Sequence, residues 1–137
     1  MHVTTNYLAL DVGSRRIGVA IADSATKIPR PLPTVMMDAS PLESIVMLAK
    51  SEQCSVIVIG FPRNQSGETT AQTTYVQQFA DKLKRDFDGE IVYQDESLTS
   101  VIAEQRLAAR QKHYDKSSID GEAACIILTD YLEQNYG

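Results

Sequence analysis

The sequence lacks a long hydrophobic run and an N-terminal targeting pattern. Its apolar stretches, such as Val56 to Ile59, are only a few residues long, whereas about 20 apolar residues are needed to span a bilayer. The first residues show no basic segment followed by an apolar one, so a secretory signal is not indicated. We therefore expect no membrane-spanning helix and a cytoplasmic protein.

Cysteine clusters and a basic excess are also missing. The two cysteines, Cys54 and Cys125, lie beside or within apolar runs and lack the spacing of a zinc site, which predicts reduced thiols in the core. The formal net charge is −5, so no overall basic field attracts a polyanion. A role on nucleic acid would depend on local basic patches or on bound metal.

The composition fits one compact domain over residues 1–137. Apolar residues make up 43% of the 137 residues and charged residues 23%, which is the balance of an ordinary globular protein. A chain of this length can bury a core without disulfide or metal crosslinks. No internal repeat or low-complexity segment divides it.

The first forty residues predict three strands. Asn6 to Val12 is apolar enough for a central strand, and Ile17 to Ala22 follows after a short glycine-containing turn, which favours an antiparallel hairpin. Residues 28–33 contain three prolines that cannot donate ladder hydrogen bonds. We expect an extended connector there, followed by an edge strand from Thr34 to Met37.

The remainder predicts alternating helices and strands. Ser40 and Glu43 have the spacing of a capping box ahead of a helix over 41–52. We expect strands over 55–60 and 90–94, and helices over 71–87, about 98–110 and from Asp120 onward. The order βββαβαβαα predicts an α/β fold with a five-stranded mixed sheet and helices on both faces.

Three carboxylates lie where such a fold collects ligands. Asp11 ends the first strand, Glu96 follows the last strand, and Asp120 begins the last helix, so all three can meet at the carboxyl edge of the sheet. Carboxylates without a histidine or cysteine cluster favour Mg²⁺ or Mn²⁺. Two such ions about 4 Å apart would activate water against a phosphodiester, which is nuclease chemistry.

Each acid also has a purely structural interpretation. An aspartate shortly before a glycine commonly forms a turn, and Asp11 stands two residues before Gly13. Glu96 and Asp120 suit the start of a helix, and Ser117 to Asp120 has capping-box spacing. Asp23 and Asp95 lie near strand ends as well, but we do not place them in the catalytic set.

Four blocks, taken in order, resemble the YqgF/RuvX family. They are Asp11 to Ala20 (DVGSRRIGVA), Ile59 to Pro62 with Asn64 and Gly67, Asp95 to Thr99 (DESLT), and Ile119 to Asp120 with Ala123, Ala124, Ile127 and Leu128. The blocks span nearly the whole chain, and the ordered set is far more specific than any one of them.

This resemblance implies a ribonuclease H-like fold related to the resolvase RuvC. It implies catalytic and metal-binding acids at Asp11, Glu96 and Asp120, with Mg²⁺ or Mn²⁺ as cofactor. The implied activity is a nuclease that processes the 5′ end of pre-16S ribosomal RNA, so precursor ribosomal RNA and ribosomal precursor particles are the implied partners. The family's older name reflects resolution of DNA junctions.

The chain departs from the family pattern beside the second acid. Ser97 stands where the family usually has arginine, and Ser100 replaces the last threonine. An arginine there could pair with a phosphate, so that contact is in doubt. Arg16, Arg15, Arg63, Asn64 and Arg106 remain as candidates for a nucleic-acid-binding rim, although each also suits a solvated surface.

Three other functions stay open from the sequence. A structure-selective endonuclease for branched DNA would keep the same acids but need two active sites, hence a dimer rather than a monomer. A non-catalytic RNA-binding module would keep the scaffold alone. An actin-like nucleotide-binding fold also uses Asp-x-Gly, but it needs two halves and this chain supplies one.

Overall fold

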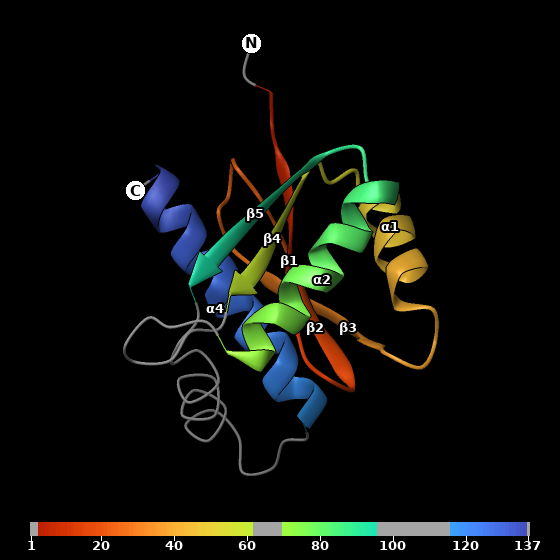
Figure 1. The fold of residues 1–137 in the computed structure, drawn as a ribbon. Coiled ribbons are helices and arrows are strands. Elements are labelled where there is room, and N and C mark those ends of the chain that lie inside the picture. The colour runs from red at the N-terminus through yellow and green to blue at the C-terminus, as the bar shows by residue number, and fades with distance from the viewer. Residues whose placement is uncertain (1–2, 62–69, 96–115, 137) are drawn as a thin grey trace.

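One mixed sheet contains every strand that the computed structural model describes over residues 3–61, 70–95 and 116–136 (Figure 1). The elements, in chain order, are β1 (Asn6–Val12), β2 (Arg16–Asp23), β3 (Arg30–Met36), α1 (Pro41–Ser51), β4 (Val56–Phe61), α2 (Ala71–Asp86), β5 (Glu90–Asp95) and α4 (Lys116–Tyr136). The strand order is β3-β2-β1-β4-β5, with β2 and β3 antiparallel and β4 and β5 parallel to β1. The predicted mixed sheet is confirmed, while the helix predicted near 98–110 lies outside the described residues.

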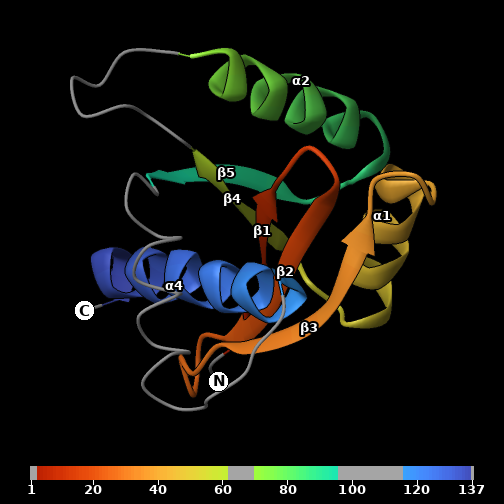
Figure 2. The same cartoon turned by 90° about the horizontal axis from the view of Figure 1, so that it is seen from below.

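Helices cover both faces of the sheet, as predicted. Figure 2 shows α4 on one side of the strands and α1 and α2 on the other. Because side chains alternate along a strand, β1 sends Leu8, Leu10 and Val12 to the α1/α2 face and Tyr7 and Ala9 to the α4 face. The central strands therefore face a core on both sides, which explains their nearly continuous apolar sequences.

The edge strand β3 is longer than predicted. It begins at Arg30 and includes Pro31 and Pro33, which the sequence assigned to a connector. The strand lies at the border of the sheet, where the outward-facing amides have no ladder partner, so proline is tolerated. Its pairing with β2 shifts register between Ile17 and Val19, which marks an irregularity beside the prolines.

The start of α1 differs from the capping box that was predicted. Ser40 is the N-cap, but it adopts a left-handed conformation (φ 52°, ψ 60°) and its side chain makes no capping hydrogen bond. A capping side chain needs an extended backbone at that position, which Ser40 does not have. Thr70, which caps α2, is extended and accepts a hydrogen bond from the Thr73 amide at 3.2 Å.

Gly18 of β2 is the point at which α4 approaches the sheet most tightly among the described glycines. A Cβ atom built on Gly18 would lie 2.0 Å from the backbone oxygen of Asp120 and 2.9 Å from its Cβ. No side chain fits there, so the missing Cβ sets how closely α4 can pack. One turn of the helix thus lies directly on the strand backbone.

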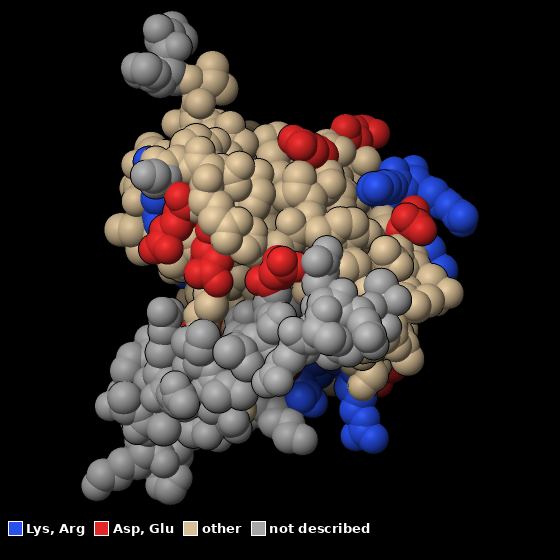
Figure 3. Space-filling view, turned by 60° about the vertical axis from the view of Figure 1, so that its left-hand side comes forward, with Lys and Arg blue, Asp and Glu red and all other residues tan. Residues whose placement is uncertain are grey.

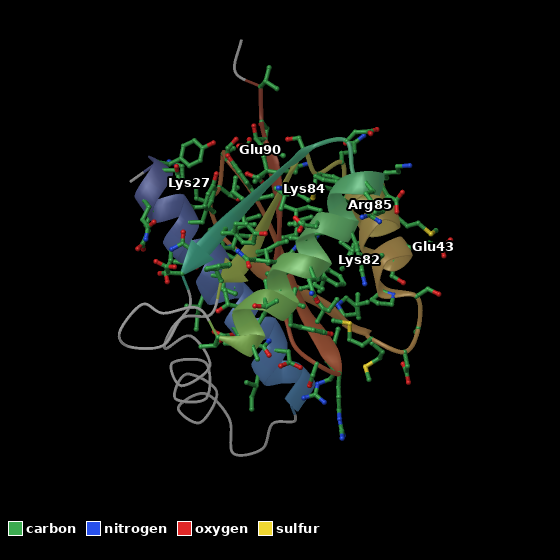
Figure 4. All side chains as sticks on the ribbon, in the orientation of Figure 1. Lys27, Glu43, Lys82, Lys84, Arg85 and Glu90 are labelled. Atoms are coloured by element: carbon green, nitrogen blue, oxygen red, sulfur yellow. The ribbon has the colours of Figure 1, made fainter. Side chains whose placement is uncertain are left out.

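Tyrosine contacts hold the C-terminal end of α4 against β1. The phenol oxygens of Tyr7 and Tyr136 are hydrogen-bonded, and Tyr7 also contacts the ring of Tyr131 with centroids 5.7 Å apart. Lys27 places its ammonium 5.2 Å from the centroid of the Tyr136 ring, beside the end of α4 in Figure 4. Burial, followed by the bond to Tyr136, raises the pKa of Tyr7 above its ordinary value.

Both cysteines are buried and free, which confirms the prediction from sequence. Burial, reinforced by the nearby charge of Glu52, raises the pKa of Cys54 to about 11. The thiol therefore stays protonated and unreactive at neutral pH. In the part of the chain that the structure describes, no helix combines the length and the apolar character needed to cross a membrane.

Replacing Gly18 by alanine should destabilise the fold by about 3 kcal/mol or more, since its methyl group would overlap backbone rather than a movable side chain. Urea unfolding measures the loss. Gly121→Ala is a suitable control in α4, because its Cβ would lie 3.1 Å from Pro31 Cβ and alanine adds about 1 kcal/mol of helix propensity. Equal stability of the two variants would contradict the close approach at Gly18.

Replacing Tyr7 by phenylalanine should cost about 1 kcal/mol of unfolding free energy at pH 7 through loss of the phenol hydrogen bond. The folded state holds the neutral phenol with a raised pKa, so the tyrosine's contribution is complete below about pH 10 and falls as the pH rises further. Unfolding at pH 7 and pH 11 should show a smaller alkaline loss for Tyr7→Phe than for the parent. Identical pH dependence would refute this assignment.

Candidate functional site

Asp11 lies near the carboxyl end of β1, on the face covered by α4. It follows Tyr7 and Ala9 in the alternation along the strand, and both of those residues belong to the α4-side core. Its direct cross-strand partner is Gly18. The Asp11 side chain is half-buried, between the buried residues Leu10 and Val12.

The packing at Gly18 brings Asp120 to the same place. Directly opposed residues in an antiparallel pair present their side chains on one face, with Cβ positions about 5 Å apart. The Cβ position of Gly18 is taken up by the backbone of Asp120. Asp11 and Asp120 therefore meet on the α4 face, although they are far apart in the sequence.

Arg16 joins this pair from the start of β2. Its Nε donates a hydrogen bond to Oδ2 of Asp120 at 2.7 Å, within an ion pair whose side chains are 26% and 21% exposed. Arg16 and Gly18 are two residues apart on one strand, so both present to the α4 face. β2 thus contacts Asp120 twice, through a side chain and through bare backbone.

The position of Asp120 within α4 corrects the sequence prediction. The helix begins at Lys116, so Asp120 lies in its second turn instead of opening it. The capping box predicted for Ser117 to Asp120 is wrong for the same reason, because both residues are inside the helix. The carboxylate is engaged by Arg16 from the sheet, a long-range contact that local spacing cannot show.

Four of the predicted site residues lie outside the described residues: Glu96, Arg63, Asn64 and Arg106. The same holds for Ser97, where the chain departs from the family pattern. The described strand β5 ends at Asp95, at the same sheet edge as the end of β1, since β1, β4 and β5 are parallel and in register. The polypeptide therefore leaves β5 toward Glu96 at the edge that carries Asp11.

Asp23 and Asp95, which the sequence left out of the catalytic set, lie elsewhere. Asp23 pairs with Asn6 at the opposite end of β1 and accepts hydrogen bonds from the amides of Ala25 and Thr26. The hydrogen bond from the Thr26 amide, first among these contacts, lowers the pKa of Asp23. Asp95 alternates with the α4-side residue Val92 and so falls on the α1/α2 face.

Among the described residues, the positively charged side chains lie in a few separate places. Arg15 is exposed in the β1–β2 turn, one residue before Arg16. Lys82, Lys84 and Arg85 gather toward the end of α2, well away from the start of α4 (Figure 4). On the face drawn in Figure 3, the described basic residues lie in separate groups, some directly beside acidic residues, and form no continuous basic field.

The described residues fit part of a hard-metal site. Asp11 and Asp120 supply carboxylate oxygens, the donors that Mg²⁺ and Mn²⁺ prefer. Within residues 3–61, 70–95 and 116–136, no three acidic, histidine or cysteine side chains group closely enough to hold a metal. A complete site here needs a ligand from beyond these ranges, where Glu96 lies.

Gly18 is the site residue whose role sequence reasoning missed. The glycine was visible inside an apolar strand, where an isolated glycine commonly marks the close approach of another backbone. The sequence does not say which backbone approaches. The structure identifies it as the second turn of α4, and so links Gly18 to the placement of Asp120.

Comparisons with known proteins identify the family. A family model described as "RuvX: Holliday junction resolvase" matches residues 5–134. A protein of Chloroflexus aurantiacus, named "Putative pre-16S rRNA nuclease", is 44% identical over 132 residues, which cover 92% of this chain and 85% of that protein. A relative of the same name from Sulfurihydrogenibium is 38% identical and covers 95% of this chain and 91% of its own length.

Solved structures show the same fold at much lower identity. RuvC of Thermus thermophilus in complex with a Holliday junction matches with a TM-score of 0.57 and 11% identity, over 97% of this chain and 96% of that one. The Fowlpox virus resolvase bound to junction DNA gives a TM-score of 0.58 at 8% identity, over 97% and 100%. The fold is ribonuclease H-like, as the sequence predicted, and the chain belongs to the RuvX family of nucleases.

Proposed function

We propose that this protein is a divalent-metal-dependent nuclease that hydrolyses phosphodiester bonds at the 5′ end of pre-16S ribosomal RNA. The names of its relatives support the substrate, and its family supports the reaction class. The observation that carries the proposal is the meeting of Asp11 and Asp120 on one face of the sheet, around Gly18.

The three predicted acids would share the metal. Asp11 is fixed by the strand that carries it, because its neighbours are buried and the strand is paired on both sides. Asp120 is fixed by the close packing of α4 on β2 at Gly18. Together with Glu96 they would hold Mg²⁺ or Mn²⁺, and two such ions when bound would activate the attacking water and offset charge on the leaving oxygen.

Substrate binding would depend on a few local cations, since the chain as a whole is acidic. Arg15 is exposed beside the acids at the β1–β2 turn and is suited to a phosphate contact. We place Arg63, Asn64 and Arg106 in the same rim. Ser97 stands where the family usually has arginine, so a phosphate contact from that position would be missing and Arg15 would contribute relatively more. The reaction belongs in the cytoplasm, where ribosomal precursor particles would present the RNA.

Cleavage of branched DNA is the second candidate, and the likeness of the fold to junction-bound resolvases favours it. Symmetric cleavage of a four-way junction needs two active sites and hence a stable homodimer. Sedimentation with and without junction DNA distinguishes this from RNA processing by a monomer. Cleavage of the junction by a dimer, with precursor RNA left intact, would replace our proposal with this one.

Asp11→Asn should abolish Mg²⁺-dependent or Mn²⁺-dependent cleavage of a 16S precursor fragment. The amide keeps the shape of the side chain but loses the charge that holds the cation. We expect the rate to fall by at least about 100-fold, because even the outer partners of metal ligands are worth about 10- to 100-fold. Gel analysis of a 5′-labelled fragment, with single-stranded RNA and junction DNA alongside, measures the loss.

Asp23→Asn is the matched control, because this aspartate lies at the opposite end of the same sheet and forms a turn. The control should cleave at the parental rate, since asparagine can still accept the turn hydrogen bonds. Cleavage by Asp11→Asn at the rate of Asp23→Asn would show that the proposed mechanism is wrong.

A further inference from the structure

We propose that Arg16 is a positioning residue for the metal site, which holds the carboxylate of Asp120 in place and does not contact substrate phosphate. This inference rests on the proposed function and deepens it. Sequence alone placed Arg16 with Arg15 in the phosphate-binding rim. The structure separates these two neighbours, because Arg15 is exposed in a turn whereas Arg16 is half-buried and engaged.

The contacts on β2 show why Asp120 needs a second point of attachment. Gly18 fixes the backbone of Asp120 but leaves its side-chain rotamer undetermined. Arg16 Nε engages Oδ2 at 2.7 Å, and this charge-assisted hydrogen bond removes the remaining freedom of the carboxylate. Oδ1 is then the oxygen of Asp120 that Arg16 Nε does not engage, and it would be the oxygen that binds a cation.

The alternative role, phosphate binding, conflicts with this geometry. To transfer its Nε to a phosphate, Arg16 would break a short hydrogen bond with a carboxylate that is only 21% exposed. The acid would then lose its positive partner in a partly buried position, which is costly. The Nη groups carry further donors, so a measurement has to decide whether they reach the RNA.

The two roles predict opposite changes in metal affinity when Arg16 is removed. Arg16 adds positive charge beside the site, so by Coulomb attraction alone its removal should tighten the binding of a divalent cation. If Arg16 orients Asp120, its removal should weaken binding, because outer partners of metal ligands typically contribute about 10- to 100-fold in affinity.

The test compares Arg16→Met with Arg15→Met in the full-length chain. Methionine keeps an unbranched stem and removes both the charge and the donors. Isothermal titration with Mn²⁺, without RNA, measures metal affinity. Binding of a labelled 16S precursor fragment over a series of salt concentrations, in EDTA, measures phosphate contacts, since losing one lowers the log–log slope by about 0.7 to 0.9.

We expect Arg16→Met to bind Mn²⁺ about 10- to 100-fold more weakly, with a parental salt slope and, in cleavage assays, a lower kcat at unchanged KM. Arg15→Met should show parental Mn²⁺ affinity and a reduced slope. Unchanged or tighter Mn²⁺ binding by Arg16→Met would overturn the proposal, and so would a salt slope reduced as in Arg15→Met.

A double-mutant cycle in melting temperature checks that Arg16→Met does not act by misfolding the protein. The stability losses of Arg16→Met and Asp120→Asn should be coupled, so that the double variant melts no lower than the less stable single variant. Additive losses would contradict the contact. Mn²⁺ affinity and melting temperature are measured without RNA, so they can support the role of Arg16 even if the precursor is not cleaved. Conversely, loss of cleavage in Asp11→Asn can support the nuclease proposal even if Arg16 proves to bind phosphate.

Discussion

The distance between α4 and β2 is governed by a missing side chain. Gly18 admits the backbone of α4 so closely that a methyl group would overlap Asp120. This contact fixes the helix along its axis and about it, because only one turn can occupy the gap. Since Gly18 is also the cross-strand partner of Asp11, the same contact that packs the helix aligns two acids with each other.

Electrostatics follow from this packing. The close approach places two carboxylates on a partly buried face, where water compensates their charge less well. Arg16 supplies one positive charge there through Asp120, and the proposed divalent cation would add more. The net charge of −5 does not exclude a role on nucleic acid, because a bound phosphodiester would experience chiefly the local field at this edge, including that of any metal held there.

The sequence predicted the elements well where a local pattern decides them. β1 was predicted with its observed bounds, and α1, α2, β4 and β5 to within a residue, because buried strands and amphipathic helices have distinct apolar periods. Errors arose where tertiary position overrides local preference. Pro31 and Pro33 are tolerated in β3 because that strand is at the sheet edge, and Ser40 does not cap because its backbone is left-handed.

The sequence suggested three candidate acids but not the geometry that brings Asp11 and Asp120 together. Placing Asp11 at a strand end needs only the strand, whereas placing Asp120 needs the contact between Gly18 and α4. The partner of Arg16 was likewise hidden, since Arg15 and Arg16 look equivalent in sequence. Only the alternation of β2 and the path of α4 give one of them to Asp120 and leave the other exposed.

The same layout separates the proposed metal ligands from the segments that would contact the substrate. Asp11 and Asp120 belong to the rigid part of the fold, because both rest on the paired strands β1 and β2. Strands β4 and β5 end at the sheet edge where Asp11 lies, and residues 62–69 and 96–115 follow them in the sequence. Substitutions in those segments, such as Ser97, can change contacts with the substrate while the seat of the acids on Gly18 stays the same. If Asp11 and Asp120 hold a metal as proposed, a protein with this fold could change the nucleic acid it cleaves without any change in these two carboxylates.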